Sequence, residues 1–311
     1  MAHHSDINKV TAGGLLVALG IIYGDIGTSP LYVFNAIING RPIDELLIIG
    51  SLSCIIWTLT LQTTIKYVIL TLKADNRGEG GIFSLYTLVR RQRKWLVIPA
   101  MLGGGALLAD GMITPPVTVT SAIEGLRNIP ALENIKEQTI VYIVLGILVL
   151  LFFMQQFGTD IIGKLFGPVM FIWFGMLAVL GISHLSDDWS ILRAFNPYYA
   201  FELLSKYPGG FLLLGAVFLC TTGAEALYSD LGHCGRGNIR ISWIFVKATL
   251  ILNYLGQGAY LLTQKGKIFA NPDLLDKASF MADFPAAQKL QSVFFALMPQ
   301  WFVLIGIIIA T

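Results

Sequence analysis

Charged residues are scarce in this sequence. Asp, Glu, Lys and Arg make up 13% of its 311 residues, whereas hydrophobic residues make up 55%. A typical soluble domain has about 25% charged residues, so the shortage argues against a soluble globular fold and against a disordered chain. The formal net charge of +2 offers no electrostatic basis for binding nucleic acid. Such an apolar chain is expected to lie in an apolar environment, and the core of a lipid bilayer is one.

Cysteine and histidine are also few and scattered. Three cysteines and four histidines show no spacing typical of a disulfide framework or of metal ligands. The Gly-rich segment Asn76–Gly81 lacks the Gly-Lys-Ser/Thr of a phosphate-binding loop and does not follow a strand. We therefore expect neither nucleotide hydrolysis nor any cofactor.

Long stretches without charge predict membrane-spanning helices, because a helix needs about 20 apolar residues to cross a bilayer core. No strand-like alternation is present, which favours a helical bundle over a barrel. We expect an all-α polytopic membrane protein in which residues 1–311 form one transmembrane transport domain. The eight predicted spans are 10–38, 46–70, 96–125, 139–156, 161–183, 209–231, 242–263 and 290–311.

Basic residues predict the orientation of these spans. Cytoplasmic loops are enriched in Lys and Arg, and the segment between the second and third spans is the most basic part of the chain. We expect this segment and the N-terminus to lie in the cytoplasm. Its basic residues are Lys73, Arg77, Arg90, Arg91, Arg93 and Lys94.

Five acidic residues lie inside the predicted spans: Asp25, Asp110, Glu124, Glu225 and Asp230. An ionised carboxylate at the centre of a bilayer costs about 3 kcal/mol on insertion scales, so such residues are candidates for function. Glu124 and Asp230 are near span ends, where they are expected to reach interfacial water or a basic partner. For Asp25, Asp110 and Glu225 a functional role is the stronger interpretation.

Asp25 lies within a predicted break of the first span. Gly24, Gly27 and Pro30 interrupt an otherwise apolar helix, and the hydroxyls of Thr28–Ser29 accompany the carboxylate. A break in hydrocarbon frees backbone groups and is tolerated only where protein or a wet cavity satisfies them. A dehydrated cation can use such freed carbonyls and half-helix ends as ligands. A simple packing kink is the alternative, and the carboxylate weighs against it.

A polar stripe runs along the third span. Asp110, Thr114 and Thr118 are four residues apart, and Ser121 and Glu124 continue on the same face of a helix. Two adjacent prolines within the stripe are expected to loosen the helix. A single Thr or Ser in such a helix often bonds its own backbone, but clustering with Asp110 favours a binding role.

The sixth span repeats features of the first. Thr222, Glu225 and Ser229 share a helical face, and Gly223 precedes the acid as Gly24 precedes Asp25. Interrupted helices at matching positions of two repeats mark the binding site of secondary transporters. One carboxylate with hydroxyls and carbonyls suits a monovalent cation. The additional carboxylates suggest that some of them exchange protons.

Four segments, in order along the chain, resemble the KUP/HAK/KT family of potassium-uptake transporters. They are Gly24–Tyr32, Ala74–Gly81, Asp110–Pro115 and Gly223–Tyr228, the last followed by Asp230, Gly232 and His233. The resemblance implies a LeuT-like inverted-repeat bundle of the amino acid–polyamine–organocation superfamily, truncated here to about eight helices. The first repeat would cover about 10–183, and the second would begin at about 209.

Family members are about twice this long, and the chain stops at Thr311 inside an apolar run. We therefore expect a fragment that lacks the cytoplasmic C-terminal domain. Some bacterial members form homodimers through that region, so a homodimer would depend on the missing part.

The resemblance also implies a function, which is potassium uptake across the plasma membrane by K⁺/H⁺ symport and not an enzymatic activity. The ion would be held between the broken first and sixth spans and the third span, with K⁺ at Asp25, Thr118 and Glu225. Asp110 or Glu225 would exchange the proton. The implied ion-binding residues are Asp25, Tyr32, Thr114, Thr118, Thr222 and Glu225.

Two alternatives stay open. An amino-acid or polyamine carrier could share the fold, although Asp25 in the broken helix would repel a substrate carboxylate. An intramembrane aspartyl protease could use two acids in the membrane, but neither Asp25 nor Asp110 follows the Gly-x-Gly that such enzymes place before the first Asp.

Overall fold

The protein is described by a computed structural model that covers residues 10–90, 93–133, 135–155 and 160–310. Helix dominates these residues, and their strands form a single small sheet. It contains β1 (Arg41–Pro42), β2 (Ile268–Ala270) and β3 (Gln288–Lys289), with β2 antiparallel to β1 and parallel to β3. Among the described residues, five helices are long and apolar enough to cross a membrane, and a bent pair of helices makes a sixth. The predicted all-α polytopic class is confirmed.

The first predicted span is divided into several pieces. Helix α1 starts where the Thr11 hydroxyl accepts a hydrogen bond from the Gly14 amide at 3.0 Å, a normal N-cap. The helical axis then bends by 67° at Tyr23. The pieces are α1 (Ala12–Ile22), α2 (Gly24–Thr28), the 3-10 turn η1 (Ser29–Leu31) and α3 (Val33–Ile38).

The sixth predicted span is also divided, and shorter elements join the spans. Its pieces are α10 (Gly210–Phe218), the 3-10 turn η8 (Leu219–Thr221), α11 (Ala226–Ser229) and α12 (Leu231–Cys234). The connecting helices are α5 (Ile82–Val89), α9 (Tyr198–Lys206), α14 (Pro272–Leu275), α15 (Ala278–Asp283) and α16 (Val293–Ala296).

The remaining predicted spans contain the helices α4 (Glu45–Thr58), α6 (Val97–Glu124), α7 (Glu137–Gln155), α8 (Asp160–Leu185), α13 (Arg236–Leu262) and α17 (Gln300–Ala310). Over the described residues α7 and α17 are shorter apolar helices, so up to six of the eight predicted spans are long and apolar enough to cross a membrane. Helix α4 continues into a 12-residue π-helical stretch, Leu59–Leu70. Helix α6 passes through Pro115 and Pro116 as one helix. Neither proline has an N–H to donate, so the predicted loosening is a loss of hydrogen bonds within a continuous helix.

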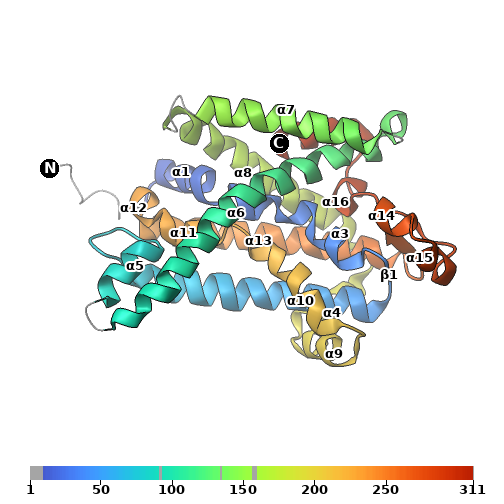
Figure 1. Ribbon diagram of the computed structural model, residues 1–311, viewed down its shortest axis with the longest axis horizontal. Coiled ribbons are helices and arrows are strands. Elements are labelled where there is room, and N and C mark those ends of the chain that lie inside the picture. Colours follow the sequence, from blue (N-terminus) through green and yellow to red (C-terminus); the bar gives the residue numbers. More distant parts are fainter. Residues whose placement is uncertain (1–9, 91–92, 134, 156–159, 311) are drawn as a thin grey trace.

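Helix α13 lies at the centre of the bundle. It packs along α8 and contacts α1 and α4, while α6 crosses the bundle obliquely and α7 lies over one side (Figure 1). Glycines let α8 and α13 approach closely. A Cβ added at Gly181 would lie 2.2 Å from the Leu252 carbonyl oxygen, and one at Gly256 would lie 2.6 Å from the Gly181 Cα. Small residues at helix contacts are typical of packing in lipid, where backbones must approach to gain dispersion energy.

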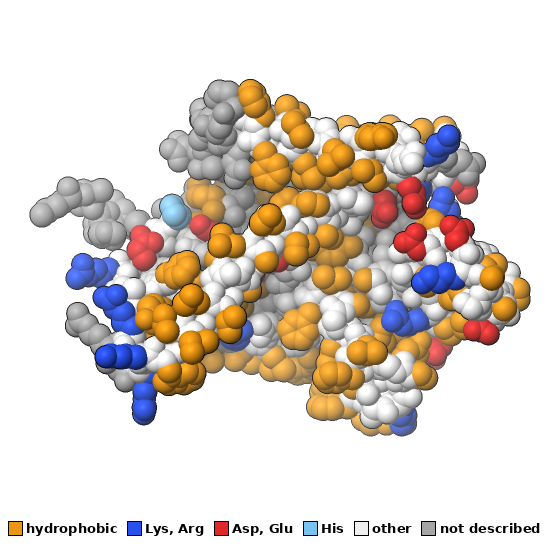
Figure 2. All heavy atoms as spheres, viewed as in Figure 1, with side chains coloured by type: hydrophobic (Ala, Val, Ile, Leu, Met, Phe, Trp, Pro, Cys, Tyr) orange, Lys and Arg blue, Asp and Glu red, His pale blue; other side chains and the backbone are white. Residues whose placement is uncertain are grey.

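The outer surface suits a bilayer. Large apolar side chains are exposed along α6 and α7, among them Leu108, Met112 and Tyr142. Figure 2 shows hydrophobic side chains across the middle of the molecule and Lys and Arg at the α5 end and again at the opposite end, where Asp and Glu accompany them. The predicted basic segment 73–94 is at that end, although Arg91 lies outside the described residues.

Replacing Gly181 by Ala tests the helix contact. The new methyl group would collide with the backbone of α13, so we expect the free energy of unfolding to fall by about 1–3 kcal/mol, the usual cost of overpacking. Thermal unfolding of the purified protein in detergent measures the effect. Gly175→Ala on the same helix is the matched control, since nothing lies within 4 Å of its added Cβ. Equal midpoints for the two variants would contradict the assignment.

Candidate functional site

The break in the first span is supported by buried side chains from α8 and α13. The Trp173 indole N–H donates to the Gly27 carbonyl at 2.8 Å, and the Gln257 amide donates to the Pro30 carbonyl at 3.1 Å. Trp173 and Gln257 are both buried. These bonds satisfy carbonyls that the break removes from helical hydrogen bonding, as an apolar environment requires.

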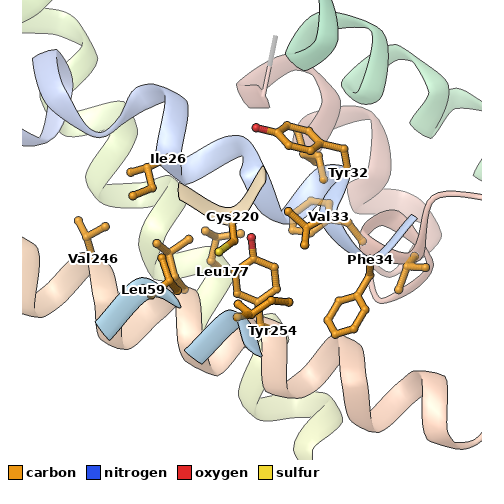
Figure 3. Packing of buried hydrophobic residues seen from close by; sticks show 14 of the residues in the cluster. Ile26, Tyr32, Val33, Phe34, Leu59, Leu177, Cys220, Val246 and Tyr254 are labelled. Carbon is orange, nitrogen blue, oxygen red and sulfur yellow. The ribbon is translucent and has the colours of Figure 1, made fainter. Parts of the chain in front are cut away.

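Further contacts hold the same segment. The hydroxyls of Ser29 and Tyr254 are 2.9 Å apart, and the Tyr23 hydroxyl donates to the Ile239 carbonyl at 2.9 Å. Figure 3 shows Tyr254 with its hydroxyl directed toward Cys220, next to the break in the sixth span, while Tyr32 points away from this group of side chains. The broken segment is thus fixed by α13 along most of its length.

The two breaks touch each other. The chain turns between Thr222 and Glu225, and Gly223 has φ +81°, a conformation that favours glycine. A Cβ added at Gly223 would lie only 2.5 Å from the Asp25 Cβ. The absence of a side chain at this position therefore lets the sixth-span turn lie directly against the acid of the first span.

Hydroxyl groups surround this contact. The Thr28 hydroxyl donates to the Asp25 carbonyl at 2.9 Å and is 3.4 Å from the Thr118 hydroxyl on α6. The Tyr32 hydroxyl lies beside the side chain of Thr222. The Thr222 hydroxyl donates to the Leu219 carbonyl of its own turn at 2.9 Å, a backbone hydrogen bond that Thr often makes in helical segments. A hydroxyl whose proton is used in this way still presents lone pairs to a cation.

The acids form a chain of contacts across three elements. The Thr114 hydroxyl donates to Asp110 at 3.0 Å, and the carboxyl groups of Asp110 and Glu225 are close enough to interact. Asp25 is close enough to interact electrostatically with both. Two ionised carboxylates this close repel each other, and a nearby positive charge would relieve the repulsion.

Asp110 and Glu225 face a cavity of about 520 Å³ at the α5 end of the molecule, here called the α5 cavity. Tyr67 and Tyr228 contribute to its wall, and so does Lys66. Sequence reasoning missed Lys66 as a site residue, although it is the residue that ends the charge-free window of the second span. The exposed Lys66 ammonium lies over the ring of its neighbour Tyr67, with 5.0 Å to the ring centroid.

A second cavity, of about 450 Å³, lies toward α14 and is here called the α14 cavity. Tyr32, Ser121 and Glu124 line it, together with Arg127 and Glu137, whose charged groups are 3.6 Å apart. The expectation that Glu124 meets a basic partner is confirmed, because Arg127 interacts with it.

Asp230, at the end of the sixth span, also has a partner, since it lies 3.7 Å from the imidazole of His233. Both acids that were expected near span ends therefore have a basic neighbour.

The predicted site residues occupy one region of the structure. Asp25, Tyr32, Asp110, Thr222 and Glu225 interact with one another, while Thr118 joins them through Thr28, and Thr114 through Asp110. In the described part of the chain, no three His, Cys, Asp or Glu side chains converge as a metal site. An ion here would therefore take hydroxyl and carbonyl oxygens as well as carboxylates.

Comparison with known proteins identifies the family. A family described as the K⁺ potassium transporter integral membrane domain matches residues 12–311. A protein of Cytophaga hutchinsonii named "Probable potassium transport system protein Kup" is 59% identical over 97% of this chain and 43% of its own length. Proteins of the same name from Flavobacterium johnsoniae and Clostridium perfringens are 54% and 56% identical, over 45% of the length of each.

No solved structure matches the chain. The chain spans less than half the length of the curated relatives named above. The match to the family model nevertheless extends over nearly all of its residues and confirms the resemblance seen in the sequence. The chain therefore belongs to the K⁺ potassium transporter family of integral membrane proteins.

Proposed function

We propose that this chain is the ion-binding part of a plasma-membrane transporter that takes up K⁺ by K⁺/H⁺ symport. The observation that carries the proposal is the contact between two broken spans at Asp25 and Gly223, surrounded by carboxyl and hydroxyl oxygens. The relatives' names supply the identity of the ion. The chemistry agrees, because K⁺ loses its water only where several oxygens of modest field strength replace it.

The ion would lie where α6 meets the two breaks. Asp25, Thr118 and Glu225 are the proposed K⁺ ligands, each from a different element. Tyr32, Thr114 and Thr222 complete the oxygen-rich surroundings. A single monovalent ion needs less negative charge than Asp25, Asp110 and Glu225 offer together, which leaves carboxyl groups available for protons.

Proton coupling is proposed for Asp110 and Glu225, which contact each other and line the α5 cavity. A shared proton would stabilise the pair when no cation is bound. A cation that enters next to Glu225 would favour release of that proton, since the positive charge then compensates the carboxylates. Binding of one ion and loss of the other are in this way linked.

We further propose that the spans belong to a LeuT-like bundle with a first repeat at about 10–183 and a second from about 209. The broken spans would be the first helices of the two repeats. The basic α5 end would face the cytoplasm, together with the N-terminus. The two cavities would then serve opposite sides of the membrane, with Tyr32 at one and Asp110 and Glu225 at the other.

The alternative of an amino-acid carrier is less well supported. A substrate carboxylate would bind the bare amides of a broken helix, but here Asp25 and the turn at Gly223 occupy that region. The protease alternative has no support among the relatives, which are named as transport proteins.

Asp25→Asn and Glu225→Gln test the ion site. Each change removes a proposed ligand charge while keeping its shape, so we expect Rb⁺ uptake at low external concentration to fall at least about tenfold, the effect of losing a charged hydrogen-bonding partner. Uptake is measured in cells that lack other potassium-uptake systems. Glu202→Gln is the matched control, because Glu202 pairs with Lys206 on α9, away from the site. Wild-type uptake in both site variants would refute the assignment.

Asp110→Asn tests the proton pair. Without a carboxyl at this position the shared proton is lost, so Rb⁺ uptake should become less dependent on external pH while Asp25 and Glu225 still bind the ion. Uptake into proteoliposomes with and without an inward proton gradient provides the measurement. An unchanged response to the gradient in Asp110→Asn, with a flattened response in Glu225→Gln, would assign the exchange to Glu225 alone.

A further inference from the structure

The short helix that follows Glu225 cannot by itself explain the position of this acid. Glu225 comes directly before α11, which has only four residues, and α12 after it has four as well. Helices of this length are not stable on their own, because the free-energy cost of nucleating a helix exceeds the gain from the hydrogen bonds of a single turn. The location of the acid must therefore come from contacts with other parts of the chain.

Tyr228 is the residue of α11 that makes the strongest of these contacts. Its hydroxyl donates to the Ala74 carbonyl at 2.6 Å, and its side chain is 4% exposed. Its backbone amide donates to the Glu225 carbonyl at 2.9 Å, which links the tyrosine directly to the acid. Tyr228 and Glu225 also share the wall of the α5 cavity.

Ala74, the partner of Tyr228, is the first of residues 74–81, here called the 74–81 loop. This loop follows the π-helical end of the second span. Gly80 packs against the Tyr228 backbone so closely that an added Cβ would lie 1.8 Å from the carbonyl oxygen of Tyr228. The Glu79 carboxylate lies over Gly232, where an added Cβ would be 2.4 Å away. The loop thus touches both short helices that follow Glu225.

An ion pair extends this contact to α13. Arg236, the first residue of α13, lies 2.5 Å from Asp75, with both side chains about one-third exposed. Exposure weakens such a pair through solvent screening, so the buried Tyr228 bond carries more of the contact. Asp75 also accepts a hydrogen bond from the Gly78 amide at 3.0 Å, and Asn76 and Glu79 exchange backbone hydrogen bonds. These internal bonds fix the shape of the loop.

We infer that the 74–81 loop is a positioning element for the Glu225 carboxyl, acting through Tyr228. This inference rests on the proposed function, because Glu225 is there a ligand and a proton carrier. The Gly-rich segment that lacks the features of a nucleotide loop thereby has a role. It is a rigid support whose glycines allow close approach to the sixth span, and it sets the distance of Glu225 from Asp110 and Asp25.

Tyr228→Phe tests the inference with little change in shape. We expect the KM for Rb⁺ uptake to rise about twofold to tenfold, the range expected for one buried hydrogen bond. The maximal rate should change less, and the pH dependence of uptake should shift because the Asp110–Glu225 contact is altered. Tyr142→Phe is the matched control, since this tyrosine on α7 is 71% exposed. Gly80→Ala should have the same effect in stronger form.

Binding to purified protein gives a second measurement. K⁺ stabilises the folded protein if it binds, so thermal unfolding with increasing KCl, at constant ionic strength with choline chloride, reports affinity without transport. Tyr228→Phe should need a higher KCl concentration for the same shift. The double variant Asp75→Asn/Arg236→Gln should raise the KCl concentration needed for the same shift by no more than either single variant does, because the two residues act as one pair.

The outcomes separate this inference from the proposed function. If the wild type neither takes up Rb⁺ nor is stabilised by K⁺, the proposed function fails and the inference fails with it. If the wild type does both, while Tyr228→Phe and Gly80→Ala keep its KM, pH dependence and KCl response, the positioning role is overturned and the ion site stands.

Discussion

Unpaired backbone groups in an apolar environment are the constraint on which this structure depends. A broken helix in hydrocarbon leaves carbonyls and amides without water, and each costs several kcal/mol if nothing replaces the lost bond. The break at Asp25 persists because Trp173 and Gln257 donate to the carbonyls of Gly27 and Pro30. The long helices α8 and α13 therefore make the site possible, although neither contributes a proposed ligand.

Support and ion binding are divided between different residues. Trp173 and Gln257 use their N–H groups as buried donors to the backbone carbonyls of the break, and an N–H group cannot bind a cation. The hydroxyls among the proposed ligands use their single proton in one bond and keep oxygen lone pairs free, as Thr114 and Thr222 do. Gly223 neither supports a break nor offers a side-chain ligand. Because it has no side chain, the two breaks can touch each other.

Local features of the sequence predicted the chemistry, and long-range packing could not be predicted from them. Asp25 among breakers, and Asp110 and Thr114 at helical spacing, were recognisable because three to four residues define a turn or a face. The partners of the breaks, Trp173 and Gln257, are more than 140 positions away in the chain, and no local pattern distinguishes them from other buried residues.

The contacts of the site link α6 to both broken spans. Helix α6 meets the first broken span through Thr118 and Thr28, and it meets the sixth through Asp110 and Glu225. A small displacement of α6 would alter both contacts together and, under the proposed function, the oxygens offered to a cation and the carboxyl groups available for proton exchange. Under the proposed function, α6 would therefore give a direct physical route by which cation binding and proton exchange are coupled.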